Sequence, residues 1–178
     1  MKKWVPNALT SARIALAAVF VLLWEIDLKP AAYAVFILAS ATDWLDGYIA
    51  RKYGFISDFG KFADPLADKI LVFSALILLI GEGVVPAWLI IFILFREFAV
   101  TGIRLIYSSR NLVIPAMFSG KLKTTVQILY IIIMAAAVIW KGPETGSMFI
   151  FILNAVLFLV SLYSFADYLI KLELNKIF

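Results

Sequence analysis

The sequence contains neither cysteine nor histidine. These absences exclude disulfides, thiol nucleophiles, imidazole bases and zinc sites of the usual Cys/His kind. Charged residues are also scarce, because they make up 16% of the 178 residues, whereas about a quarter is usual in a soluble domain. Any catalysis must therefore use carboxylates, amines, hydroxyls or a bound metal.

Apolar residues, in contrast, make up 64% of the chain. That share is about 114 residues, close to the roughly 120 that six membrane spans of about 20 residues require. Breaks rich in proline, glycine and charge divide the chain into six apolar segments, at about 8–28, 31–51, 64–81, 86–108, 120–140 and 147–170. We therefore expect an all-α polytopic membrane protein, with residues 1–178 forming a single membrane-embedded domain of six transmembrane helices.

The start of the chain resembles a secretory signal, because Lys2 and Lys3 precede an apolar run. Arg13 interrupts this run early and further apolar segments follow, which favours a retained first span. With six spans, both termini lie on one side of the membrane, and the distribution of lysine and arginine decides which side.

Basic residues are concentrated on the side that holds the termini, whereas the opposite side has only Lys29 and Lys141. The terminal side holds Lys2, Lys3, Arg13, Arg51, Lys52, Lys61, Lys69, Arg104, Arg110, Lys121, Lys123, Lys171 and Lys176. We expect this side to be cytoplasmic and the membrane to be the bacterial inner membrane. The net charge of +4 then reflects topology, and no nucleic-acid partner is expected.

The second segment carries two carboxylates inside an expected span. At about 100° per residue, Asp43, Asp46, Gly47 and Ala50 fall within one helical sector. The third segment opens with Asp64-Pro65-Leu66-Ala67-Asp68, whose two acids are four residues apart and share a face. Because proline is tolerated at a helix start, we place these two acids in or near the first turns. The four aspartates can then converge at the cytoplasmic boundary.

Four carboxylates at a membrane boundary are costly unless they are protonated, ion-paired or bound to metal. One interpretation is a salt-bridge network, with partners Arg51, Lys52, Lys61 and Lys69. The other is a cage of hard oxygen ligands, which selects Mg²⁺ or Mn²⁺, or else Ca²⁺. Two such ions about 3.5 to 4 Å apart are suited to clamping a diphosphate during a displacement at phosphorus.

Gly47 and Ala50 leave the acidic face of the second segment without bulk. A flat or extended ligand would have room against the backbone there. Small residues at this spacing are also typical of close helix packing in membranes. Both interpretations remain open from the residues alone.

The spacing of these residues resembles the signature of the CDP-alcohol phosphatidyltransferases. It reads Asp43-x-x-Asp46-Gly47-x-x-Ala50-Arg51, then eight residues, then Gly60-x-x-x-Asp64-x-x-x-Asp68, with all eight fixed positions present. The resemblance implies a six-helix membrane enzyme, usually a homodimer, that displaces CMP from a CDP-linked lipid with an acceptor hydroxyl.

The same resemblance implies a role for each residue of the signature. Two divalent ions, Mg²⁺ or Mn²⁺, would be held by the four aspartates, and Asp68 would also serve as general base. The nucleotide would bind at Gly47, Ala50, Arg51 and Gly60.

Other parts of the chain are similar to one branch of that family, the phosphatidylglycerophosphate synthases. The matching stretches are Asn7-x-Leu9-Thr10-x-x-Arg13, Arg96-Glu97-Phe98 continuing to Gly102-x-Arg104, Gly120-Lys121-x-Lys123-Thr124, and an acid and an aromatic at Asp167 and Tyr168. This branch would transfer the phosphatidyl group of CDP-diacylglycerol to glycerol 3-phosphate within a lipid membrane.

A phosphate-bearing acceptor requires fixed cations close to the metals. Arg104, Lys121, Lys123 and Arg110 lie at the cytoplasmic ends of the fourth and fifth segments, where they can bind this phosphate or simply be loop charges. We favour Arg104 as a phosphate ligand and loop charge for Arg110. Lys121 and Lys123 point in different directions on a helix, so at most one of them touches the phosphate.

Arg96 and Glu97 lie about 15 Å into the fourth segment, where charges are typical of a function or a buried pair. We expect a pair that braces the substrate pocket rather than direct catalysis.

Three other functions remain open: the same chemistry with inositol phosphate or serine as the acceptor, a membrane prenyltransferase, and a cation transporter whose acids line a pathway.

Overall fold

The computed structural model of the chain describes the backbone of residues 5–53, 58–109, 117–141 and 146–177. Side chains are described for residues 12–42, 69–109, 117–140 and 146–171. Six helices form this part of the chain: α1 (Val5–Glu25), α2 (Lys29–Tyr53), α3 (Asp58–Gly81), α4 (Ala87–Ser109), α5 (Phe118–Lys141) and α6 (Ser147–Ile177). The predicted all-α class and the six helices are confirmed for these residues.

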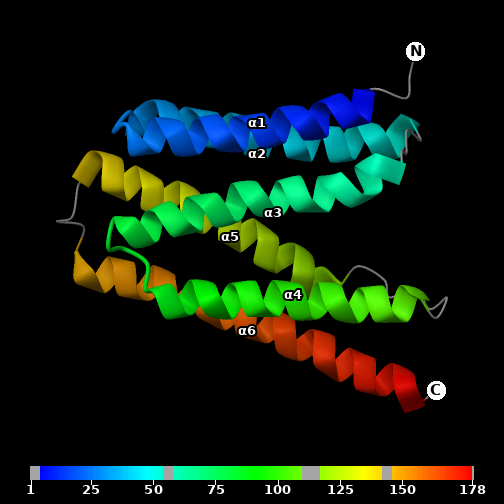
Figure 1. Cartoon of the computed structure of the whole chain (residues 1–178). Coiled ribbons are helices and arrows are strands. Elements are labelled where there is room, and N and C mark those ends of the chain that lie inside the picture. Colours follow the sequence, from blue (N-terminus) through cyan, green and yellow to red (C-terminus); the bar gives the residue numbers. More distant parts are fainter. Residues whose placement is uncertain (1–4, 54–57, 110–116, 142–145, 178) are drawn as a thin grey trace.

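The helices run back and forth along one axis, and both ends of the chain lie at the same end of the bundle (Figure 1). We call this the terminal end, and the other the opposite end. Helix α1 packs against both α2 and α3, while α6 packs against α4 and α5. Helix α5 also contacts α2 and α3, so it joins the two groups of helices.

Two helix boundaries differ by more than three residues from those expected. Helix α3 begins at Asp58, six residues before the expected start, so Gly60 lies within the helix and Pro65 is its eighth residue rather than part of its first turn. An acidic residue at a helix N-terminus is favourable because it opposes the helix dipole, and this favours the earlier start. Helix α6 continues to Ile177, seven residues past the expected end.

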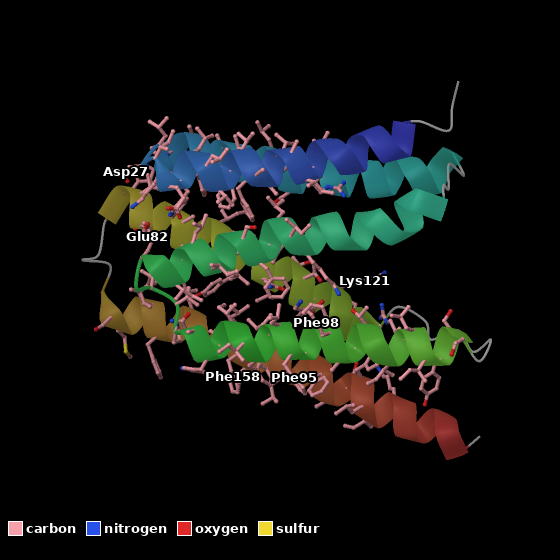
Figure 2. All side chains as sticks on the ribbon, viewed as in Figure 1. Asp27, Glu82, Phe95, Phe98, Lys121 and Phe158 are labelled. Carbon is pink, nitrogen blue, oxygen red and sulfur yellow. The ribbon has the colours of Figure 1, made fainter. Side chains whose placement is uncertain are left out.

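The interior is an apolar cluster drawn from all six helices. Phe20 of α1 lies between Trp24 of its own helix and Phe36 of α2, with ring centroids 6.0 and 5.5 Å away. Large apolar side chains also cover the outside, among them Phe95 and Phe98 of α4, which are 62% and 66% exposed (Figure 2). Such an exposed apolar surface suits contact with lipid.

Two helices in the described part of the chain are long and apolar enough to cross a bilayer. They cover Phe118–Trp140 in α5 and Ser147–Lys171 in α6. Helix α4 has a span's length but contains Arg96, Glu97 and Arg104. The apolar helices and surface indicate a membrane protein.

At the opposite end, α1 and α3 end in the same way. Asp27 and Gly83 follow the helices with positive φ angles of 64° and 73°. In each case the next amide donates to a carbonyl five residues earlier, from Leu28 to Leu23 and from Val84 to Leu79, the pattern of a Schellman cap. Glycine is the residue that adopts this conformation without strain, which explains Gly83.

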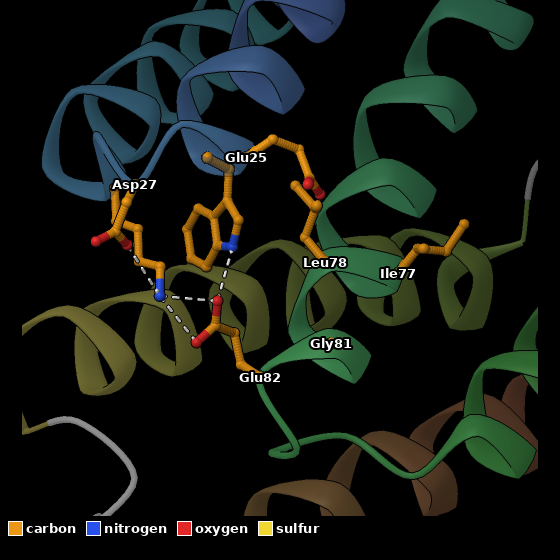
Figure 3. A pocket seen from close by; sticks show the side chains of 8 residues that line it. Glu25, Asp27, Ile77, Leu78, Gly81 and Glu82 are labelled. Atoms are coloured by element: carbon orange, nitrogen blue, oxygen red, sulfur yellow. Dashed lines mark hydrogen bonds and ion pairs between the residues drawn. The ribbon is translucent and has the colours of Figure 1, made fainter.

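A polar cluster fastens the α1–α2 connection to the end of α3 (Figure 3). The indole of Trp24 and the ammonium of Lys29 both donate to the carboxylate of Glu82, each at 3.0 Å. Lys29 also lies 3.5 Å from the carboxylate of Asp27. These groups line a recess of about 370 Å³ at the opposite end of the bundle.

Candidate active site

A cation-lined pocket of about 660 Å³ opens among α2, α3, α4 and α5. Its wall contains four basic side chains and one acid, together with small hydroxyl-bearing and apolar residues. The charged members are Lys69, Arg96, Glu97, Arg104 and Lys121. Figure 2 shows Lys121 between the ribbons of α3 and α4. This composition is suited to an anionic polar ligand.

The carboxylate of Glu97 is the centre of the charges in this pocket. Its Oε1 accepts hydrogen bonds from Arg96, at 2.5 Å, and from Lys123. Its Oε2 lies 3.9 Å from the ammonium of Lys69. Arg96 also donates to the hydroxyl of Ser164 on α6 at 2.7 Å. The expected Arg96–Glu97 pair is therefore present, and it ties α4 to α3, α5 and α6.

The four cations predicted to bind the acceptor phosphate differ in their surroundings. Arg104 lines the pocket, and its guanidinium lies 5.6 Å from the ring centre of the buried Tyr168. Lys121 also lines the pocket, whereas the side chain of Lys123 is only 5% exposed and pairs with Glu97. Arg110 lies outside the described residues. The structure thus places Lys121 but not Lys123 in the pocket wall, and the helical spacing predicts that at most one of them is there.

The four aspartates of the signature lie on the two helices that flank the pocket. Asp43 and Asp46 are in α2, and Asp64 and Asp68 are in α3, but their side chains are outside the described part of the chain. The same holds for the predicted nucleotide residues, Gly47, Ala50, Arg51 and Gly60. Elsewhere in the described residues, no three carboxylates come together as a metal site would require.

The helical register continues from the described side chains into the aspartates. In α2, the buried Phe36 and Ala39 are each seven residues before Asp43 and Asp46, so these positions share one helical face. In α3, the buried face that includes Leu71 and Val72 continues back through positions 68 and 64. Both aspartate pairs therefore occupy register positions that match the inward faces of their helices.

A buried cation lies at the same level of the bundle. Phe20 of α1 contacts Phe36 of the antiparallel α2. Seven residues further toward the terminal end on each helix are Arg13 and Asp43, respectively. Arg13 is only 4% exposed. Its guanidinium is therefore a buried charge at the level of position 43.

Sequence reasoning assigned no role in acceptor binding to two of the residues near the pocket. Lys69 was considered as a counter-ion for the aspartates, but its ammonium donates to Thr101 of α4 at 2.7 Å and lies near Glu97. Ser164 was not considered at all, although it holds Arg96. The only available indication for Lys69 was its place directly after Asp68, since its partners are 28 and 32 residues away.

Comparison with known proteins places the chain in a family. Residues 3–163 match the CDP-alcohol phosphatidyltransferase family, a range that includes the four aspartates and the whole pocket wall. The chain belongs to the CDP-alcohol phosphatidyltransferases. It is therefore an enzyme, and the sequence-based recognition of this family is confirmed.

Individual members of the family are similar over most of the chain. The CDP-diacylglycerol–glycerol-3-phosphate 3-phosphatidyltransferase of Bacillus subtilis is 46% identical over 140 residues, which are 70% of this chain and 72% of that protein. The protein of the same name from Rickettsia typhi is 40% identical over 135 residues, covering 74% and 76%.

A third relative carries a related name. The "Probable phosphatidylglycerophosphate synthase" of Mycobacterium tuberculosis is 44% identical over 127 residues, which are 68% of this chain but 60% of that protein. The matches to these three relatives thus cover between 68% and 74% of this phosphatidyltransferase chain.

Proposed function

We propose that this phosphatidyltransferase transfers the phosphatidyl group of CDP-diacylglycerol to glycerol 3-phosphate, giving phosphatidylglycerophosphate and CMP. The relatives named for this reaction support the substrates. The choice of glycerol 3-phosphate as the acceptor rests on one observation, the cation-lined pocket beside the two aspartate-bearing helices. A phosphate monoester needs such cations, whereas serine, an acceptor without a phosphate, does not.

We place the enzyme in the bacterial inner membrane as a multi-pass homodimer with both termini in the cytoplasm. The lysine and arginine distribution supports this orientation. In this arrangement the pocket and the aspartates face the cytoplasm, where a water-soluble acceptor is available. The acyl chains of CDP-diacylglycerol would remain in the lipid beside the apolar helix surfaces.

The donor set of the four aspartates fits two Mg²⁺ or Mn²⁺ ions, because oxygen ligands without histidine or cysteine suit hard divalent cations. When bound, such ions neutralise the diphosphate and stabilise the charge that develops on the leaving CMP. Asp43 and Asp46 from α2 and Asp64 and Asp68 from α3 would hold them.

The remaining steps belong to the protein's own side chains. Arg104 and Lys121 bind the phosphate of glycerol 3-phosphate and orient its hydroxyl toward the phosphatidyl phosphorus. As the hydroxyl oxygen forms its bond to phosphorus, its proton passes to the carboxylate of Asp68 and the bond to CMP breaks. An aspartate with an ordinary pKa near 4 is a weak base at pH 7, so orientation and electrostatics supply the larger share of the acceleration.

Replacing any of the four aspartates tests the proposed reaction. We expect Asp43→Asn, Asp46→Asn, Asp64→Asn and Asp68→Asn each to lower CMP release by about 10³-fold or more, because asparagine keeps the size but removes the charge. The measurement is Mg²⁺-dependent release of CMP by purified enzyme with CDP-diacylglycerol and glycerol 3-phosphate. Asp167→Asn, which replaces a carboxylate outside the signature, is the matched control and should retain activity.

A panel of acceptors completes this experiment. Glycerol 3-phosphate should be preferred over inositol phosphate, and serine should be a poor acceptor. Near-normal turnover in three of the four aspartate variants would contradict the metal site, and preference for an uncharged acceptor would contradict the cation pocket. Metal flux into liposomes without CMP formation would favour a transporter instead.

A further inference from the structure

The five cations in and beside the pocket use their hydrogen-bond donors differently. The terminal nitrogens of Arg96 are already engaged within the protein, because they donate to Glu97 and Ser164. Lys123 is buried against Glu97. In contrast, Arg104 and Lys121 donate no side-chain hydrogen bond to any residue that the structure describes, although both line the pocket.

Lys69 resembles the second group. Its side chain is 27% exposed, compared with 5% for Lys123, and it lines the pocket. Its ammonium donates one hydrogen bond, to Thr101, within the described part of the chain. Because an ammonium carries three N–H donors, Lys69 keeps two for a ligand.

Glu97 fixes this arrangement. Its Oε1 is occupied by Arg96 and Lys123, while its Oε2 faces Lys69 at 3.9 Å, which is an ion-pair distance and too long for a hydrogen bond. The carboxylate therefore attracts the Lys69 ammonium toward α4 without using up its donors. Thr101, one turn after Glu97 on α4, holds the ammonium on the same side.

We infer that Lys69 is a further binding residue for the acceptor phosphate, and that Glu97 is the positioning residue that holds its ammonium at the pocket. This inference rests on the proposed function. Lys69 from α3, Arg104 from α4 and Lys121 from α5 then present cations from three helices to the three terminal oxygens of one phosphate monoester. Lys123 is a structural counter-ion of Glu97.

The arrangement also connects the acceptor site to the chemistry. Lys69 directly follows Asp68, the proposed base. A phosphate bound to Lys69 is therefore held by the same turn of α3 that carries the carboxylate receiving the proton. Binding of the acceptor at this lysine brings its hydroxyl into reach of the reacting groups.

The first test is Lys69→Met, which keeps most of the side-chain bulk and removes the charge. We expect the KM for glycerol 3-phosphate to rise by about 10- to 100-fold, the usual effect of losing a hydrogen bond to a charged group. The KM for CDP-diacylglycerol and the Mg²⁺ concentration for half-maximal activity should stay unchanged. Lys69→Arg should recover part of the loss, and Lys171→Met, at an exposed lysine outside the pocket, is the control.

The second test separates positioning from charge balance. Glu97→Gln should also raise the KM for glycerol 3-phosphate by about 10-fold or more, because Lys69 is no longer drawn to α4. The double variant Glu97→Gln with Lys123→Met has the net charge of the wild type and also removes the lysine that pairs with Glu97. It provides a second measurement should the single variant fail to fold. We expect its KM for glycerol 3-phosphate to remain high.

The outcomes distinguish this inference from the proposed function. An unchanged KM for glycerol 3-phosphate in Lys69→Met would overturn the role of Lys69, while wild-type turnover with that acceptor would leave the proposed function intact. A wild-type KM in the double variant would show that Glu97 only neutralises Lys123. A shifted Mg²⁺ requirement in Lys69→Met would show that Lys69 acts through the aspartates. A wild-type enzyme that uses only uncharged acceptors would overturn both proposals.

Discussion

Arg104 and Tyr168 form a pair in which the aromatic ring and the hydroxyl contribute differently. The face of the Tyr168 ring lies 5.6 Å from the guanidinium of Arg104, so it holds this pocket cation by a cation–π contact. The tyrosine is only 2% exposed, yet its hydroxyl has no hydrogen-bond partner in the described structure. A buried hydroxyl without a partner opposes folding, so the favourable contribution of Tyr168 comes from its ring.

Two substitutions, Tyr168→Phe and Tyr168→Leu, test whether the ring and the hydroxyl contribute in this way. Phenylalanine keeps the ring, so we expect an unchanged KM for glycerol 3-phosphate and a thermal stability equal to or above that of the wild type. Leucine removes the ring, and the KM should rise by about 2- to 5-fold, equivalent to the ~0.5 to 1 kcal/mol of an exposed cation–π contact. Steady-state kinetics and thermal unfolding in detergent measure both effects. A KM increase in Tyr168→Phe would instead indicate a role for the hydroxyl.

At the scale of the helices, an ion-pair cluster links the α1–α2 connection to the end of α3 at the opposite end of the bundle. Lys29 is the first residue of α2 and precedes its apolar stretch. The hydrogen bond with Glu82 raises the pKa of Lys29 above its ordinary value of 10.5, although partial burial opposes this. The fold therefore favours the protonated lysine. Its contribution to stability is complete below about pH 10.5 and is lost as the pH rises through the higher pKa of the folded state.

Lys29→Met tests this link between protonation and stability. At about pH 8 the variant should unfold at a lower temperature than the wild type, because Glu82 loses its cation. The difference should shrink as the pH rises above about 10.5 and through the raised pKa of Lys29, where the wild type loses this proton. Thermal unfolding across this pH range measures the difference, with Lys171→Met as the control for loss of a lysine elsewhere. A difference that stays constant with pH would contradict the argument.

For the whole molecule, the orientation in the membrane decides whether the pocket can meet its substrate. Both termini lie at one end of the bundle, and α6 has 31 residues, or roughly 46 Å at 1.5 Å per residue. This exceeds the ~30 Å of a hydrocarbon core, so an α6 that crosses the bilayer would extend into water. Its basic residues at the terminal end, including Lys171, suit the cytoplasmic surface.

Reporter fusions test this orientation. A reporter that is active only in the cytoplasm should function when fused after Phe178, whereas one that is active only outside should function when inserted at Gly83, between α3 and α4. The physical reason is the excess of lysine and arginine at the terminal end. The reverse pattern would place the pocket outside the cell and would contradict the proposed use of a cytoplasmic acceptor.

Sequence periodicity predicted the helices well but placed the start of α3 six residues too late and the end of α6 seven residues too early. The six apolar segments correspond to six helices, because runs of apolar residues between proline and glycine breaks leave few alternatives in a membrane. The start of α3 was predicted at residue 64, whereas the helix begins at Asp58. Glycine and proline were read as signs of a break, but Gly60 and Pro65 are both accommodated within the helix. Packing against α1 outweighs their unfavourable helix propensity.

The sequence by itself determined the features that depend on neighbours along the chain. Helical spacing puts the aspartates on shared faces and separates Lys121 from Lys123, because residues three or four apart lie on one side of a helix. The spacing of the signature also identified the family.

Only the tertiary structure decided which charges meet between helices. Glu97 pairs with Lys123, 26 residues later, and lies beside Lys69, 28 residues earlier. No local pattern encodes these partners, because they depend on how α3, α4 and α5 pack in three dimensions. The same packing buries Lys123 and leaves Lys69 at the pocket, so the choice between two chemically equal ammonium groups comes from helix packing and not from residue type.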